Sequence, residues 1–215
     1  MKDKLIKFFK RSSIFKWFKF TLPKLRYTHY FKKLKIDEKA ILLESQHGTE
    51  FSGNMFYLIK ELATNEEYKS YKVYVSCRVG NKAKLEKVFE KYGIENVIPV
   101  VLSTFKYMKL LASAKYLFND NTFLPFYLKK PGQVYLNTWH GTPLKTLGKG
   151  IRNAMHGIGN AQKNFIAADY LLYPNTYTME HMIEDYMLEN VALGKAVLAG
   201  YPRNTAFFNK NRGVK

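Results

Sequence analysis

The sequence has a single cysteine, Cys77, among its 215 residues, which excludes an intramolecular disulfide framework and fits a reducing compartment. It has no run of about 18 to 20 consecutive apolar residues, so we expect no membrane-spanning helix. Acidic residues are scarce, with 17 Asp and Glu against 35 Lys and Arg, and the net charge is +18. Such an excess of cations favours a polyanionic partner, either nucleic acid, anionic lipid or a phosphate-rich polymer.

Apolar residues, in contrast, are plentiful. Hydrophobic residues make up 47% of the chain and aromatic residues 16%, which is ample for a packed core and excludes a wholly disordered chain. At about 150 residues per domain, the length corresponds to roughly 1.4 domains. We therefore expect one full domain with an extension.

The extension is the basic segment at residues 1–35. Residues 1–39 contain 13 Lys and Arg against 3 Asp and Glu, so they hold +10 of the net charge of +18. Cations and bulky apolar side chains alternate at helical spacing, which predicts two short amphipathic helices with a break at Ser12 and Ser13. Pro23 is expected to end the second helix.

Several functions compete for this segment. A secretory signal is excluded because lysines interrupt every apolar run. A nucleic-acid-binding arm would use the cations but has no need of the bulky apolar groups. An in-plane membrane anchor uses both, since each cation near an anionic surface contributes on the order of 1 kcal/mol. The alternative is a helix packed on the protein's own core, and we favour the membrane surface.

Beyond residue 35, short apolar strands alternate with helices. The expected strands are residues 39–45, 71–76, 96–101, 115–119, 133–140, 170–174 and 196–200, and the expected helices include 55–63, 81–93 and 104–114. This alternation predicts an α/β domain over residues 36–209, built on a Rossmann-like parallel sheet. Residues 210–215 are expected to begin an interdomain linker. In such sheets ligands bind beyond the carboxyl ends of the strands, so the loops there are the places to search.

The first of these loops is residues 46–54. Ser52 or Asn54 is expected to cap the helix that follows, whose N-terminal N–H groups can bind phosphate. The loop lacks the ending of a Walker motif, so an ordinary strand-to-helix turn is the simpler interpretation. The second loop, residues 119–132, either places Asp120 and its neighbours against a ligand or is a long connection.

The third loop, residues 137–145, offers the best catalytic candidate. His140 is expected at the end of a strand, next to Gly141 and close to a proline that fixes the turn. An imidazole titrates near neutrality and can accept a proton from a hydroxyl group, although a structural histidine bonded to a carbonyl fits the pattern equally well. The cations Lys145 and Arg152, with Arg203 in a fourth loop, are suited to phosphate.

Other kinds of site have little support. The histidines and the lone cysteine do not stand at metal-ligand spacing, so we expect no metal and no cofactor. The sequence contains no RNP-like strand, helix-turn-helix or zinc-finger pattern, so we expect no nucleic-acid partner.

The run YLNTWHGTPLKTLGKG, residues 135–150, resembles the Trp-His-Gly-Thr-Pro signature of the CDP-glycerol glycerophosphotransferase family, the teichoic acid primases and polymerases. The stretches ILLESQHGTEFSGN, KYLFNDNTFLPFYLKKPGQ, DYLLYPNTYTMEHM and AGYPRN resemble the family's segments on either side of it. The resemblance therefore covers residues 36–209.

The resemblance implies a two-domain GT-B enzyme that is peripheral to the cytoplasmic face of Gram-positive membranes. Family members transfer polyol phosphate from a CDP-polyol such as CDP-glycerol to a hydroxyl on a lipid-linked glycan acceptor. His140 matches the proposed catalytic base. The chain corresponds to the N-terminal, acceptor-binding domain, and the C-terminal donor-binding domain is missing, so the chain alone is expected to be inactive. Two positions differ from the family pattern: Gly150 and Thr205 stand where relatives often have aspartate.

The alternative to this enzyme is a non-catalytic protein at the membrane surface that binds anionic glycopolymer or lipid. Under the enzyme hypothesis, the residues expected to bind the acceptor or its phosphates come from the four loops. They are Gln46, His47, Ser52, Asn54, Asn119, Asp120, Thr138, Gly141, Thr142, Lys145, Arg152 and Arg203.

Overall fold

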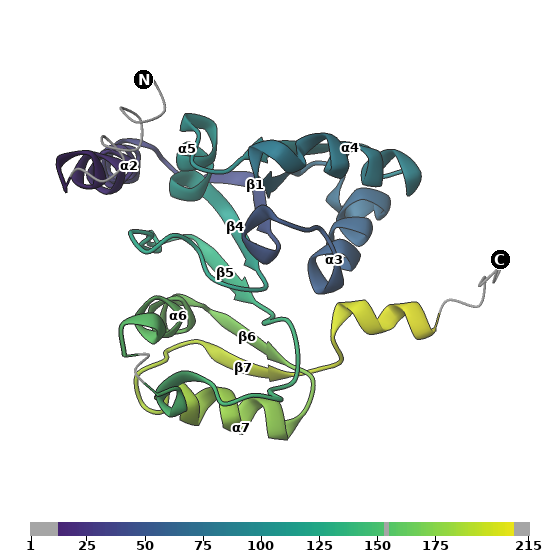
Figure 1. Cartoon of the computed structure of the whole chain (residues 1–215). Helices are drawn as coiled ribbons and strands as arrows, with labels where there is room; N and C mark the ends of the chain where they lie inside the picture. The colour runs from purple at the N-terminus through teal and green to yellow at the C-terminus, as the bar shows by residue number, and fades with distance from the viewer. Residues whose placement is uncertain (1–12, 153–154, 209–215) are drawn as a thin grey trace, which may run out of the picture.

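A computed structural model of the chain describes residues 13–152 and 155–208 (Figure 1). Seven parallel strands form one sheet: β1 Asp37–Glu44, β2 Lys72–Cys77, β3 Val97–Val101, β4 Ala114–Asn119, β5 Val134–Asn137, β6 Tyr170–Tyr173 and β7 Lys195–Leu198. The α-helices are α2 Ser13–Lys33, α3 Gly53–Thr64, α4 Lys82–Lys91, α5 Phe105–Ser113, α6 Met155–Ala167 and α7 Thr176–Asp185. The predicted α/β class with a Rossmann-like parallel sheet is confirmed.

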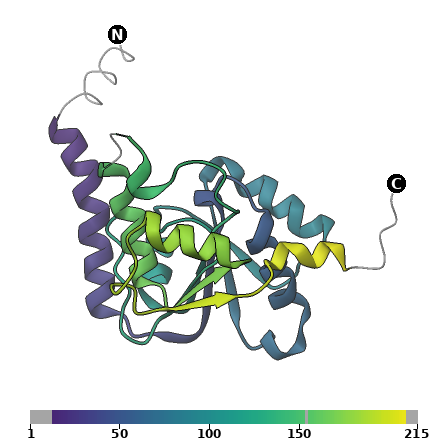
Figure 2. The same cartoon turned by 90° about the horizontal axis from the view of Figure 1, so that it is seen from below.

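The strand order is β3-β2-β1-β4-β5-β6-β7. The chain therefore builds the sheet outward from β1 to β3, returns to place β4 beside β1, and then builds in the opposite direction. Because strand crossovers are right-handed, reversing the direction moves the helices to the other face of the sheet. Figures 1 and 2 show α3 and α4 apart from α5, α6 and α7, as this rule requires. We call the point between β1 and β4 the switch point.

Two apolar cores lie on the two faces. Along β1, Ala40 and Leu42 pack with residues of α2, α5, α6 and α7, whereas Ile41 and Leu43 pack with α3 and α4. All four side chains are at most 3% exposed. A strand that is buried on both faces needs a continuous apolar run, which explains the sequence AILL at this point.

The structure corrects the expected end of the strand at 133–140, since β5 stops at Asn137. The side-chain oxygen of Asn137 accepts a hydrogen bond from the N–H of Trp139 at 2.9 Å, and Trp139 has a φ of 50°. This left-handed backbone turns the chain away from the sheet. His140 consequently lies in a turn beyond the strand.

The prediction that Pro23 ends a helix is wrong, because α2 continues through it to Lys33. A proline inside a helix removes one hydrogen bond and costs about 3 kcal/mol. Tertiary packing offsets this cost: Tyr27 is 2% exposed, and its hydroxyl donates to the carbonyl of Leu128 at 2.6 Å. The first of the two predicted helices lies outside the described residues.

Helix α2 has two apolar faces. At 100° per residue, Tyr27 and Phe31 lie on one side of the helix and Phe18, Leu22 and Leu25 lie roughly opposite. The first pair packs on the core, whereas the other three are 55%, 43% and 58% exposed. The second half of α2 is therefore part of the domain, while its other face remains open. No helix within residues 13–152 and 155–208 is long and apolar enough to cross a membrane.

Candidate active site

Three turns meet at the switch point, beyond the carboxyl ends of the central strands. They are residues 45–48 after β1, 120–123 after β4 and 138–141 after β5. Neighbouring strands here build their outer loops in opposite directions, which leaves a crevice where α/β sheets bind ligands. Of the polar residues singled out in the sequence, Gln46, His47, Asp120, Thr138 and His140 lie in these turns.

A row of buried polar side chains crosses the ends of the strands. Glu44 of β1 pairs with Asn119 of β4, and Asn119 pairs with Asn137 of β5. Ser76 of β2 donates to the Glu44 carboxyl oxygen Oε2 at 3.1 Å, and the hydroxyl of Tyr107 donates to the same oxygen at 2.7 Å. Burial raises the pKa of Glu44 to about 7. This acid is the last residue of an apolar strand, which was the signal that could have identified it, but sequence reasoning missed it.

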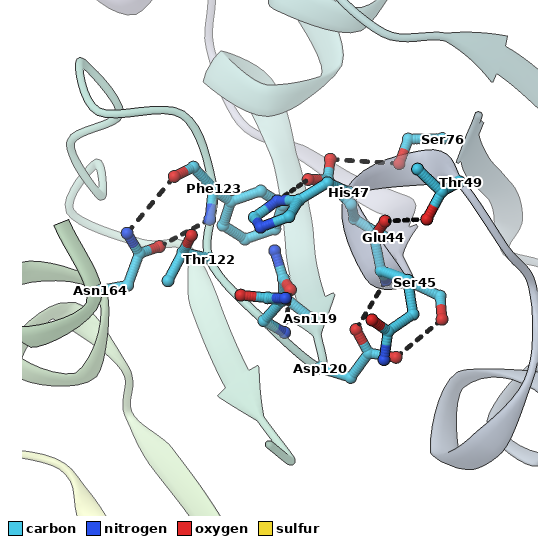
Figure 3. A network of polar contacts seen from close by, with 12 residues as sticks. Glu44, Ser45, His47, Thr49, Ser76, Asn119, Asp120, Thr122, Phe123 and Asn164 are labelled. Atoms are coloured by element: carbon cyan, nitrogen blue, oxygen red, sulfur yellow. Dashed lines mark hydrogen bonds and ion pairs between the residues drawn. The ribbon is translucent and has the colours of Figure 1, made fainter. Parts of the chain in front are cut away.

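Asp120 ties the turn after β4 to the turn after β1. Its carboxylate accepts a hydrogen bond from the Ser45 hydroxyl at 2.7 Å and another from the N–H of Gln46 at 2.9 Å, as Figure 3 shows. Gln46 and His47 both have left-handed backbones, with φ of 48° and 51°. Burial raises the pKa of Asp120, although its hydrogen bonds oppose this shift. Asp120 therefore acts as a brace for an unusual turn rather than as an exposed ligand.

The main chain of Asp120 orients His140. The ring nitrogen Nδ1 of His140 lies 2.8 Å from the carbonyl oxygen of Asp120. A carbonyl only accepts hydrogen bonds, so Nδ1 is the nitrogen that holds the proton. In the neutral ring, Nε2 then has a free lone pair, and it makes no hydrogen bond with any described residue. The half-buried ring also lies against Trp139, with 4.0 Å between the centroids.

Asn54 and Arg203 hold the peptide groups on either side of His140. The Asn54 amide Nδ2 donates to the carbonyl of Trp139 at 3.2 Å, and its oxygen accepts from the N–H of Arg203 at 3.4 Å. The Arg203 guanidinium Nη1 donates to the carbonyl of His140 at 3.0 Å. Asn54 also reaches the buried hydroxyl of Thr138 at 3.3 Å. We call Asn54 and Arg203 the clamp.

The clamp corrects one expectation at the start of α3. Ser52 stands at the N-cap position, but its side chain makes no capping hydrogen bond, and Asn54 lies inside the first turn. Asn54 does not cap the helix because its side chain is committed to Trp139 and Thr138. Neither predicted cap is therefore formed.

The exposed candidates do not share this organisation. Thr142, Lys145 and Arg152 are exposed, and the chain after His140 runs along α7 to the turn Gly148–Gly150 (Figure 1). That turn packs at the C-terminal end of α7, where Lys149 pairs with Glu184 at 3.2 Å. A helix that follows a parallel strand runs antiparallel to it, so the C-terminal end of α7 lies near the amino ends of the strands. Arg152 therefore lies toward the opposite end of the strands from His140. Gly141, by contrast, stays beside His140 in half-buried but open space.

An open crevice lies beside these turns, on the side of β2 and β3, with a volume of about 530 Å³. Its polar lining includes Glu44, His47 and Arg78, and its apolar lining includes Leu102, Phe123 and Leu124. Burial lowers the pKa of His47. In the part of the chain that the structure describes, no three His, Cys, Asp or Glu side chains are grouped so that they could hold a metal ion.

The chain is similar to proteins of teichoic acid synthesis. It is 31% identical over 187 residues to the teichoic acid glycerol-phosphate transferase of Staphylococcus aureus, covering 83% of this chain and 44% of that protein. It is 30% identical over 184 residues to the teichoic acid poly(glycerol phosphate) polymerase of Bacillus spizizenii, covering 82% of this chain and 44% of the polymerase. The fold matches a structure of the wall teichoic acid polymerase TagF with a TM-score of 0.68 and 21% identity, covering 91% of this chain and 47% of TagF.

The chain thus spans less than half the length of these relatives. Residues 25–214 match the family described as CDP-glycerol:poly(glycerophosphate) glycerophosphotransferase. The match begins within α2 and includes all seven strands and the turns at the switch point. The chain therefore belongs to the CDP-glycerol:poly(glycerophosphate) glycerophosphotransferase family.

Proposed function

We propose that this chain supplies the acceptor-binding half and the catalytic base of an enzyme that transfers glycerol phosphate from CDP-glycerol to a lipid-linked glycan. The product is a teichoic acid or a related cell-wall or capsular polymer. The single observation that supports this role best is the orientation of His140, whose Nδ1 is held by the Asp120 carbonyl. The relatives named above act in this chemistry, and the switch point is where such a fold binds ligands.

In this proposal, Nε2 of His140 accepts the proton of the acceptor hydroxyl. The acceptor oxygen attacks the phosphorus that bears glycerol, a new P–O bond forms, and the bond to the departing CMP breaks. Phosphoryl transfer depends mainly on positioning and charge neutralisation. The clamp and the Asp120 carbonyl supply the positioning. A second half, corresponding to the rest of the relatives, would hold the CDP group, and without it we expect no turnover.

The test reconstitutes the chain with the donor-binding half of a family polymerase and measures incorporation of labelled glycerol from CDP-glycerol into a lipid-linked acceptor. His140→Ala should abolish incorporation, whereas His181→Ala on α7 should leave it unchanged. Equal incorporation by the two variants would refute the assignment of the base. Incorporation by the chain without the added half would refute the need for a partner.

The open face of α2 supports a second part of the proposal, peripheral binding to an anionic membrane. Phe18, Leu22 and Leu25 are exposed there, and Lys32 and Lys33 are exposed at the end of the same helix. Apolar groups on one face of a helix with cations nearby are typical of helices that lie in the membrane interface. The same surface would serve the alternative function, a non-catalytic protein that binds anionic lipid or glycopolymer.

Deletion of residues 1–35 would remove Tyr27 from the core, so substitutions are the cleaner test of membrane binding. Replacing Phe18, Leu22 and Leu25 with serine should abolish sedimentation with phosphatidylglycerol vesicles and leave the melting temperature unchanged. Three serines elsewhere on the surface, at Val79, Tyr170 and Leu193, form the control. Unchanged sedimentation of the α2 variant would contradict the membrane proposal.

A further inference from the structure

The crevice contains three polar groups that the proposed transfer does not use. They are the carboxyl of Glu44 at the end of β1, the imidazole of His47 in the turn after it and the guanidinium of Arg78 after β2. A volume of about 530 Å³ lies within the range of small-molecule sites, which is roughly 300 to 1,000 Å³. The question is which chemistry these groups would recognise together.

Glu44 has one oxygen bonded and one available. Oε2 accepts hydrogen bonds from Ser76 and Tyr107, whereas Oε1 accepts none from the described residues. Nδ1 of His47 lies 3.9 Å from Oε1 (Figure 3). Glu44 is 2% exposed, and it lines the crevice. A carboxyl oxygen held in this way is a natural partner for a hydroxyl group.

Arg78 has the opposite character. Its Nε donates to the carbonyl of His47 at 3.3 Å, which aligns the side chain with the turn after β1. Its two terminal nitrogens have no hydrogen bond with any described residue, and the side chain is exposed. A guanidinium with both terminal nitrogens open is suited to two oxygens of a phosphate group. Arg203 differs, because the carbonyl of His140 already occupies its Nη1.

The remaining lining is apolar. Leu102, Phe123 and Leu124 give the crevice a surface that suits the C–H groups of a sugar or polyol. Phe123 and His47 both line the crevice, so apolar and polar surfaces belong to the same site. The fit is therefore to a molecule with hydroxyl, phosphate and C–H surfaces close together.

We propose that the crevice binds a polyol phosphate or sugar phosphate, with a hydroxyl on Oε1 of Glu44 and the phosphate on Arg78 and His47. This inference rests on the proposed function, since it identifies the ligand with the terminal polyol phosphate of the acceptor. The pKa of Glu44, about 7, supports it because a carboxyl that is partly protonated at neutral pH tolerates a nearby anion. Thr122 and Phe123 line the crevice, and the carbonyl of Asp120 in the same turn holds His140, so a bound chain end would lie on the turn that orients the base.

The test measures binding of sn-glycerol 3-phosphate to the 215-residue chain by calorimetry at fixed ionic strength. We expect it to bind at least about tenfold more tightly than inorganic phosphate, because phosphate lacks the glycerol hydroxyl groups that would contact Glu44. Arg78→Ala and Glu44→Gln should each weaken binding by about tenfold. The matched controls are Lys72→Ala and Glu38→Gln, at the opposite ends of the same two strands, and they should leave binding unchanged.

Equal binding of phosphate and glycerol phosphate, or equal weakening by Arg78→Ala and Lys72→Ala, would overturn the proposal, because general attraction to a basic protein then suffices. Tighter binding of CDP-glycerol through Arg78 and Glu44 would overturn the assignment to the acceptor. If glycerol phosphate binds as expected but His140→Ala retains transfer in the reconstituted enzyme, the proposed function fails and the crevice proposal stands. Melting curves show that each variant is folded.

Discussion

The two ends of the segment at residues 137–152 differ in nearly every physical respect. Residues 137–140 are mostly buried, and their backbone and side chains are bonded to three other parts of the chain. Residues 142–152 run over the surface, and their lysines and arginine are exposed. The sequence predicted site residues at both ends, with His140 as the catalytic base and Lys145 and Arg152 as phosphate-binding cations. At this site, a backbone held in place by hydrogen bonds distinguishes the candidate active centre from its surroundings, whereas the density of cations does not.

The largest expected difference between the two ends is in transfer. In the reconstituted enzyme, His140→Gln should lower the rate by about 10²- to 10⁴-fold, the usual contribution of a general base. Lys145→Ala and Arg152→Ala together should lower it less than about threefold, because both side chains are exposed and lie outside the turns. Initial rates of glycerol incorporation measure both. A larger loss from the double variant would reverse the comparison.

The next effect concerns the buried carboxyl. Burial raises the pKa of Glu44 from its ordinary value of 4.5 to about 7, so the folded state binds this proton more tightly than the unfolded state. Wild type should therefore lose stability relative to Glu44→Gln as the pH rises from 4.5 to 7, by on the order of 3 kcal/mol. Urea unfolding of both proteins across this range measures the difference. Glu38→Gln, at the exposed start of β1, is the control for removing a carboxyl charge from the same strand.

A smaller effect is expected on the free energy of unfolding, where substitutions of Asn54 and Ser52 should differ although the two residues are close in sequence. Asn54→Ala leaves the carbonyl of Trp139 with fewer partners and should cost about 1 to 3 kcal/mol of unfolding free energy. Ser52→Ala should change it by less than about 0.5 kcal/mol, because Ser52 makes no capping bond. Thermal unfolding of the two variants suffices. A loss of about 1 kcal/mol from Ser52→Ala would indicate a cap that the structure lacks.

The smallest effect is expected at Arg203, as a positioning residue. Arg203→Lys keeps the charge but not the fork that reaches the carbonyl of His140. We expect kcat to fall about tenfold while KM for the acceptor changes less than about threefold. A change in KM alone would show that Arg203 binds the acceptor directly, as its sequence pattern first indicated.

The sequence predicted the sheet well because each strand is a short apolar run, and runs such as AILL in β1 admit few other interpretations. It also located the three turns, since ligands of parallel sheets lie beyond strand ends. It missed the roles of Glu44, Tyr107 and Asn54. These depend on contacts between residues 63 to 85 positions apart, which no local pattern encodes.

Pro23 also shows that local sequence rules do not include tertiary contacts. The local rule that proline ends a helix is correct for an isolated segment. It failed because Tyr27, four residues later, is inserted in the core of the domain. Local propensity therefore gave the right element in the first half of α2 and the wrong boundary.

The double-sided character of α2 has a mechanical consequence. One face of α2 packs on the core, and under the membrane proposal the other face lies on the lipid. The domain is then held at a fixed distance from the membrane, because one helix contacts both. His140 would then lie at a fixed height above the lipid headgroups. An acceptor whose reactive end does not reach that height could not be elongated. The position of α2 would therefore set the shortest lipid-linked primer that the enzyme can use.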